Sequence, residues 1–188
     1  HIEKMQKVNA IKAPEMVENG PLKAVIRSEY KYNHSTFTQD MVVYKDSKRI
    51  DFKTHADWHE LNTLLKVAFY VDIRTTKATY DIQFGHVERP THWNNSWDWA
   101  KFEVCGHKWA DISESGYGVS LLNDCKYGHS IKDNAMKLSL LRSPKHPDTE
   151  ADMGEHDFIY ALYPHRGTVT EGGTIEEANR LNLPAQIV

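Results

Sequence analysis

Hydrophobic and polar residues alternate with a period of two along most of the chain. The clearest run is 50–58, where Ile50, Phe52 and Trp58 alternate with charged and polar residues. Such alternation predicts a β-strand with one face on a core and the other in water. A similar run covers 37–43, and the polar link 45–48 between the two runs predicts a hairpin turn.

Further runs predict strands at 24–32, 65–71, 78–84, 119–122, 135–141 and 156–163. We expect 65–71 and 78–84 to pair across the polar link 74–77. Near the C-terminus, Thr174 and Glu177 fit a capping box, followed by Ala178 and Leu181, which predicts a short helix at about 174–182. Seven to nine strands and one helix indicate an all-β fold, an antiparallel β-sandwich. We place the sandwich domain at 20–165, after a leader at 1–19 and before a C-terminal extension at 166–188.

The composition narrows the function classes. With 188 residues and 40% hydrophobic residues the chain has material for a core. Its net charge of −3 disfavours a nucleic-acid binder, and no apolar run is long enough to cross a membrane. The start at His1 suggests a piece of a longer protein, and Cys105 and Cys125 are typical of reduced thiols in a cytoplasmic protein.

Two polar stretches rich in aromatic residues, 86–109 and 123–155, are predicted to be loops that carry function. The first holds Trp93, Trp97, Trp99 and Trp109 among amide and carboxylate side chains. Tryptophan faces beside such hydrogen-bonding groups suit a sugar ring. Equally, these rings could close one end of the sandwich, since tryptophan is usually well buried.

Metal and nucleophile patterns are weak. His55 and His59 fall on or beside a predicted strand, where four residues span about 13 Å, too far for two zinc ligands. Cys125 lies between Asp124, which opposes thiolate formation, and Lys126, which favours it. No pair of loop carboxylates stands out. We therefore expect no catalytic residue, no metal ligand and no cofactor in this chain.

Three long runs nevertheless carry a resemblance. They are 55–73, 84–130 and 138–167, with the motifs LLND-x-KYG and ADMGEH-x-F-x-YAL-x-PH. Residues 20–182 closely resemble the C-terminal region of glycoside hydrolase family 38 α-mannosidases, in the cytosolic and bacterial branch.

The resemblance implies a β-sandwich of the galactose-mutarotase-like kind, which packs on an N-terminal catalytic barrel and a helical domain of the same polypeptide. In that family the barrel carries the aspartate nucleophile of a retaining mechanism and the ligands of a catalytic zinc. Neither motif has a match here. The resemblance thus implies Zn for the full-length enzyme only.

Some positions match the family individually. Arg142 resembles the arginine at the head of an acidic loop near the cleft, although the usual arginine pair is replaced here by Arg-Ser-Pro. Asp148 and Asp152 match acids of that loop. The expected cleft-facing, substrate-binding residues are these three together with Asn123, Asp124, Lys126, Tyr127, Trp93 and Trp97.

The leading hypothesis is a non-catalytic part of an enzyme that removes terminal α-linked mannose from oligosaccharides in the cytoplasm. Its expected partners are the barrel, the helical domain, a mannose-containing oligosaccharide and a second copy of the chain paired through truncated sheet edges, with no nucleic acid and no membrane. An alternative is a carbohydrate-binding module that stacks sugars on Trp93, Trp97 and Trp99. A third, a mutarotase-like epimerase, follows from fold analogy alone.

Overall fold

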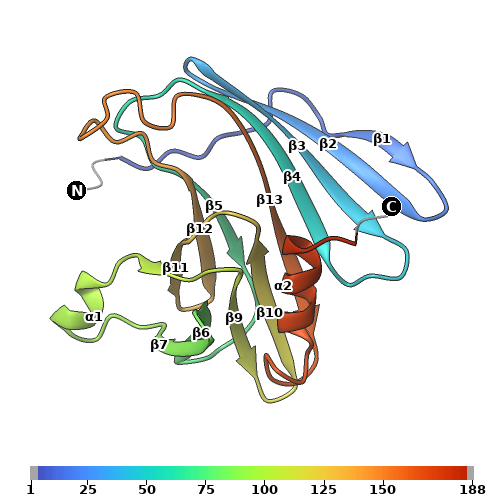
Figure 1. Ribbon diagram of the computed structural model, residues 1–188, viewed down its shortest axis with the longest axis vertical. Helices are drawn as coiled ribbons and strands as arrows, with labels where there is room; N and C mark the ends of the chain where they lie inside the picture. Colours follow the sequence, from blue (N-terminus) through green and yellow to red (C-terminus); the bar gives the residue numbers. More distant parts are fainter. Residues whose placement is uncertain (1–3, 186–188) are drawn as a thin grey trace.

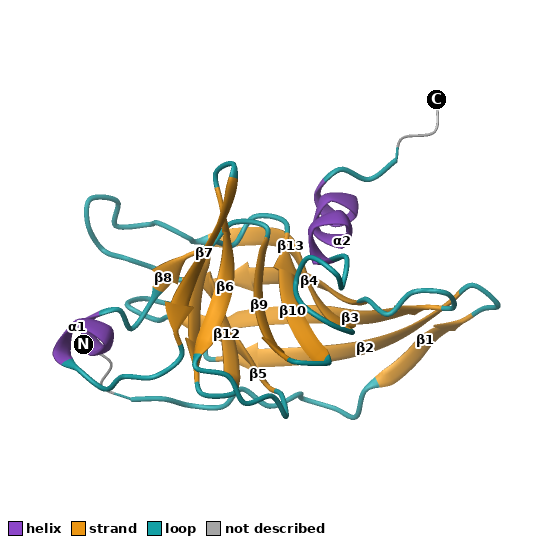
Figure 2. Cartoon of the chain, turned by 90° about the horizontal axis from the view of Figure 1, so that it is seen from below, coloured by secondary structure: helices purple, strands orange, loops and turns teal. Residues whose placement is uncertain are grey.

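Two antiparallel sheets form the molecule, which a computed structural model describes over residues 4–185. The predicted all-β sandwich with a short C-terminal helix is confirmed (Figures 1 and 2). The large sheet has the order β1-β2-β3-β4-β13-β10-β9-β6-β7, and the small sheet has the order β5-β12-β11-β8. Neither helix in this part of the chain is long and apolar enough to cross a bilayer.

The strands of the large sheet are β1 (Glu15–Asn19), β2 (Lys23–Tyr32), β3 (Ser35–Tyr44), β4 (Ile50–Trp58), β6 (Lys77–Ile82), β7 (Gly85–Pro90), β9 (Trp109–Glu114), β10 (Tyr117–Asn123) and β13 (Gly154–His165). Those of the small sheet are β5 (Leu65–Tyr70), β8 (Val104–Cys105), β11 (Gly128–Lys132) and β12 (Ala135–Leu141). The helices are α1 (Ser96–Ala100) and α2 (Thr174–Asn182).

The main core lies between the two sheets. Alternate residues of the central strands point into it, for example Ile112 of β9, Leu121 of β10 and Tyr160 of β13. Met136 and Leu138 of β12 close it from the small sheet. The period of two in the sequence is therefore the inward face of a stacked pair of sheets.

A second, smaller core lies on the opposite face of the large sheet. There Trp109, Leu122 and Ala161 pack against Ala178 of α2. These residues neighbour inward-facing ones in sequence, so β9, β10 and β13 are buried on both faces. Figure 2 shows α2 standing beside this part of the large sheet.

Three details differ from the sequence-based expectations. Strands β5 and β6 do not pair, because β5 joins β12 in the small sheet and β6 joins β7 and β9 in the large one. The stretch 86–109 contains α1 and strand segments rather than loop alone. The capping box is absent, since the N-cap of α2 is Gly173 and the Thr174 hydroxyl instead lies 2.6 Å from Ser120 Oγ.

Candidate functional site

Asn123 is a buried residue that holds the turn between β10 and β11. Its Nδ2 donates to the carbonyl of His107 (2.8 Å), and its Oδ1 accepts from the backbone N–H of Lys126 (2.7 Å). Its own carbonyl accepts from Asn182 Nδ2 at 3.0 Å, which ties the turn to α2. All three polar groups of Asn123 therefore hold the turn in place within this chain.

The next residues of the motif contact β13. Asp124 Oδ2 accepts from the backbone N–H of Ile159 (3.0 Å), and Lys126 Nζ lies 4.5 Å from the centre of the Phe158 ring. Tyr127 is 52% exposed. Of the four candidate residues in this motif, Tyr127 is thus the one whose side chain is exposed.

Cys125 follows Asp124 in the same turn. Desolvation and the neighbouring Asp124 carboxylate raise the pKa of the Cys125 thiol to about 11. A thiol with that pKa stays protonated at neutral pH, so it is a poor nucleophile.

The acidic loop between β12 and β13 is organised around Asp152. Its Oδ2 accepts from the backbone N–H groups of Arg142 (2.8 Å) and Ser143 (3.0 Å). Burial opposes ionisation of Asp152, but these two hydrogen bonds hold its pKa below the usual value. Arg142 and Asp148 are exposed at the loop surface.

These two segments meet beside the first residues of β13. The charge of Lys126 is close enough to help lower the pKa of Asp152. Asn123, Asp124, Lys126 and Asp152 are therefore brought together, although three of them are engaged with backbone groups. Figure 1 shows the acidic loop and the α1 loop as separate projections, so Trp97 does not join this group.

The tryptophans fall into three environments. Trp109 is 2% exposed on β9 beneath α2, whereas Trp97 and Trp99 on α1 are 79% and 66% exposed. Trp93 is half-buried, with Lys132 Nζ 4.0 Å from its ring centre. Trp97 and Trp99 therefore do not close the end of the sandwich, and Trp109, although buried, lies on the outer face of the large sheet under α2.

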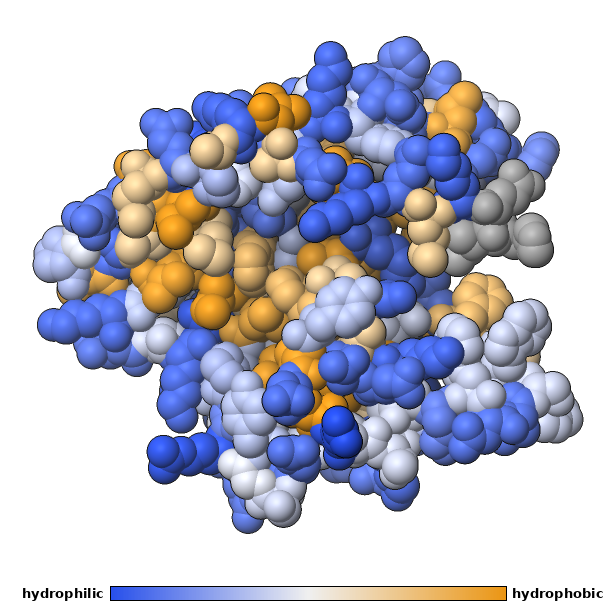
Figure 3. Space-filling view, turned by 180° about the vertical axis from the view of Figure 1, so that it is seen from behind, coloured by the Kyte–Doolittle hydropathy of each residue, from blue (hydrophilic) through white to orange (hydrophobic). Residues whose placement is uncertain are grey.

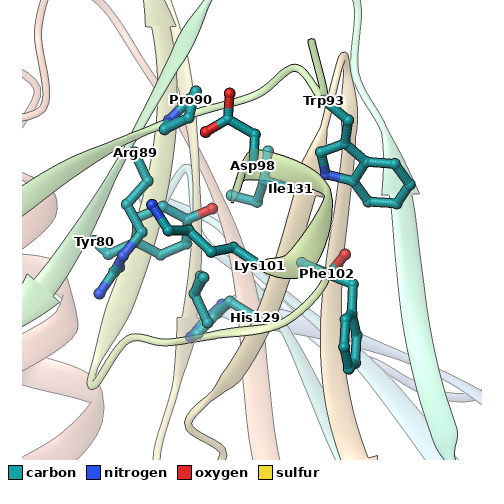
Figure 4. A pocket seen from close by; sticks show the side chains of 11 residues that line it. Tyr80, Arg89, Pro90, Trp93, Asp98, Lys101, Phe102, His129 and Ile131 are labelled. Atoms are coloured by element: carbon teal, nitrogen blue, oxygen red, sulfur yellow. The ribbon is translucent and has the colours of Figure 1, made fainter. Parts of the chain in front are cut away.

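A pocket beside Trp93 contains groups that the sequence did not point to. Arg89 of β7, Lys101 after α1 and His129 of β11 line it together with Tyr80 (Figure 4). The sequence did contain a pattern that could have identified His129. It lies two residues before Ile131, so in a strand both side chains point to the same, inward face. Since polar residues interrupt the alternation in β7 and β11, neither strand was expected.

The described residues do not fit a metal ion. Within 4–185, no group of three or more His, Cys, Asp or Glu side chains is placed to hold one. Among these residues the most deeply buried histidine–carboxylate pair is His165 Nε2 with Asp111 Oδ2 at 2.7 Å, and these side chains are 0% and 2% exposed. A substrate cannot reach that pair without unfolding of the surrounding sheet and α2.

Comparison with known proteins identifies relatives of the whole sandwich. Residues 1–150 match the glycosyl hydrolases family 38 C-terminal domain. The chain is 49% identical to Alpha-mannosidase G of Dictyostelium discoideum over 172 residues, covering 89% of this chain and 16% of that protein. It is 50% identical to human Alpha-mannosidase 2C1, in a match that covers 80% of this chain and 14% of the human protein. It is 55% identical to Alpha-mannosidase of Saccharomyces cerevisiae, in a match that covers 71% of this chain and 12% of the yeast protein.

A crystal structure of an alpha-mannosidase from Enterococcus faecalis V583 has the same fold, with a TM-score of 0.82 at 17% identity. The match covers 94% of this chain and 24% of that one. The chain thus spans a small fraction of the relatives that it matches. With the family match covering most of its length, the chain belongs to the C-terminal domain family of the family 38 glycoside hydrolases.

Proposed function

We propose that the chain is the non-catalytic sandwich of a retaining, zinc-dependent α-mannosidase that hydrolyses terminal α-linked mannose in oligosaccharides. The observation that carries this proposal is the match of residues 1–150 to the C-terminal domain family, with relatives named as alpha-mannosidases. The aspartate nucleophile and the zinc ligands would lie outside this chain. Of the acids near the candidate motifs, Asp124 and Asp152 are engaged with backbone groups and Asp111 is enclosed.

The chain alone is expected to show no hydrolysis of an aryl α-mannoside, with or without added zinc. The full polypeptide that contains it should hydrolyse the same substrate in a parallel assay. If the chain alone turned over the mannoside, and Asp124→Asn or Asp152→Asn abolished that turnover, the non-catalytic assignment would be wrong.

The proposed function also predicts that one face of the sandwich packs against other domains of the same polypeptide. Figure 3 shows an apolar area in the middle of the rear face, surrounded by polar side chains, which is typical of a surface that another part of a protein covers. We assign this face to the barrel and helical domain of the same polypeptide. We also propose a cytoplasmic location, on the resemblance to the cytosolic branch.

Two copies of the isolated chain are expected to pair through open sheet edges. Strand β5 is an outer strand of the small sheet, and its single charged residue is Lys66. An edge with so little charge is a template for pairing. Light scattering at high concentration should show a dimer, and a strictly monomeric chain would contradict this.

Sugar binding at α1 is the second candidate, which the exposure of Trp97 and Trp99 favours. If these rings stack on sugars, calorimetry should detect saturable binding of mannobiose, and Trp97→Ala should weaken it by roughly 10-fold or more, the effect of losing one aromatic platform. Phe84→Ala is the matched control, because Phe84 is also a highly exposed aromatic residue but lies at the β6–β7 turn. The absence of binding heat would assign these rings to contacts with the rest of the polypeptide.

A further inference from the structure

The pocket beside Trp93 encloses polar atoms that have no partner. His129 is 0% exposed, and neither of its ring nitrogens has a hydrogen-bond partner within residues 4–185. Nη1 of Arg89, which lines the same pocket, is buried and equally without a partner there. Buried polar groups in native proteins are almost always satisfied, so three such atoms around one cavity indicate a missing occupant.

The chemistry of the walls defines that occupant. Burial lowers the pKa of His129 to about 3, so its ring is neutral at pH 7, with one donor and one acceptor nitrogen. Nη1 of Arg89 is a donor. The carboxylate of Asp98 disfavours binding of an anion in this pocket, and the positive charges of Arg89 and Lys101 disfavour binding of a cation. A neutral group that both donates and accepts, such as a hydroxyl, can pair with Nη1 of Arg89 and with one of the two ring nitrogens of His129.

The space is of the right size. The centre of a water-sized group can occupy a volume of about 20 Å³ in the pocket, which is enough to hold one such group. Gly106 contributes to this tight fit, because a Cβ there would lie 2.9 Å from Cδ2 of the His129 ring. The whole empty space of the pocket, part of which is open to solvent, is about 360 Å³, and Trp93 and Phe102 are among the residues that line it.

We propose that this pocket is a hydroxyl-binding site, in which Arg89 and His129 hold the oxygen of either an ordered water or a sugar whose ring lies at the mouth. Figure 4 shows Arg89, His129 and Lys101 gathered on one side of the pocket, with Trp93 and Phe102 on the other. The idea that a sugar supplies this hydroxyl rests on the proposed function. The idea that the pocket binds a hydroxyl rests only on the unpartnered atoms of Arg89 and His129.

The ¹⁵N chemical shifts of the His129 ring, measured in the whole chain at pH 7, test the site. The acceptor nitrogen should show the upfield shift of a hydrogen-bonded imidazole. Arg89→Met, which removes the guanidinium group that lies 4.7 Å from the centre of the Tyr80 ring and with it the donors, should change that shift. Arg74→Met, at an exposed arginine outside the pocket, should leave the shift unchanged.

Titration with methyl α-mannoside separates the two sources. A saturable change in the His129 resonances, lost in Arg89→Met, would assign the hydroxyl to a sugar. An unchanged, hydrogen-bonded resonance, with ordered water density near Nη1 of Arg89 in a crystal structure, would assign it to water. A ring nitrogen without the hydrogen-bonded shift, and no density, would overturn the site. That result would leave the mannosidase assignment intact, because the activity assay tests it independently.

Discussion

Gly118→Ala is expected to lower the free energy of unfolding by at least about 3 kcal/mol, because a methyl group at this position has no room. A Cβ on Gly118 would lie 2.6 Å from Nε2 of His165 and closer still to Cε1 of that ring and to the Ser113 hydroxyl. Neither neighbour can move easily, since both hydrogen-bond to the buried carboxylate of Asp111. Overpacking alone costs about 1–3 kcal/mol, and displacing His165 and Ser113 would leave the buried Asp111 carboxylate short of two hydrogen bonds, which costs about 1–3 kcal/mol for each lost partner.

Urea and thermal unfolding of the variant measure this effect. For a chain of this length the melting temperature should fall by roughly 6 °C or more. Gly116→Ala, in the adjoining β9–β10 turn, is the control, because a Cβ there would meet nothing within 4 Å. Stability of Gly118→Ala within about 0.5 kcal/mol of the parent chain would show that His165 is not held against Gly118.

The same network connects the sheet to the helix and to the candidate motif. Ser120 donates to Asp111 Oδ2 at 2.7 Å and contacts the first residue of α2, Thr174. At the other end of the helix, Asn182 holds the carbonyl of Asn123. A change at Gly118 should therefore also loosen the Asn123 turn, although the two residues lie at opposite ends of β10.

The alternation of hydrophobic and polar residues predicted those strands that have one face on the core and the other in water. Strand β4 is an example, because Phe52 and Trp58 face the core side and charged residues stand between them. Strand β9 shows where the pattern fails, since Asp111 and Trp109 on its second face are also buried and no alternation is visible. The pairing of β5 failed for another reason: the choice of sheet depends on long-range contacts with β12 that local pattern does not contain.

The candidate residues show the same limit. The LLND-x-KYG and ADMGEH motifs correctly marked turns that meet near β13. They did not show which side chains face outward and which hydrogen-bond to the backbone. Asn123 and Asp152 brace it, and Tyr127 faces outward. The pocket around His129 was missed because its members come from separate strands and from the segment after α1, which only the fold brings together.

His129 is expected to make the chain sensitive to mild acid. Burial, with smaller contributions from the charges of Lys66 and Arg89, lowers the pKa of its imidazole from the usual 6.5 to about 3. Between these values the unfolded chain binds a proton that the folded chain does not. The free energy of unfolding should therefore fall by about 1.4 kcal/mol for each pH unit below about 6.5, and this contribution should vanish above that pH.

Urea unfolding between pH 6.5 and 5 isolates this effect, because carboxylates remain largely ionised over that range. His55 acts in the opposite direction, since its hydrogen bond to Asp157 raises its pKa, but its side chain is 50% exposed and its effect is small. His129→Phe cannot take up a proton and should abolish most of the slope, whereas His86→Gln, at an exposed histidine, should keep it. A parent chain and a His129→Phe variant with equal slopes would mean that water reaches the ring and that the imidazole titrates normally. The size of the difference therefore measures how completely the two sheets and the α1 loop exclude solvent from His129.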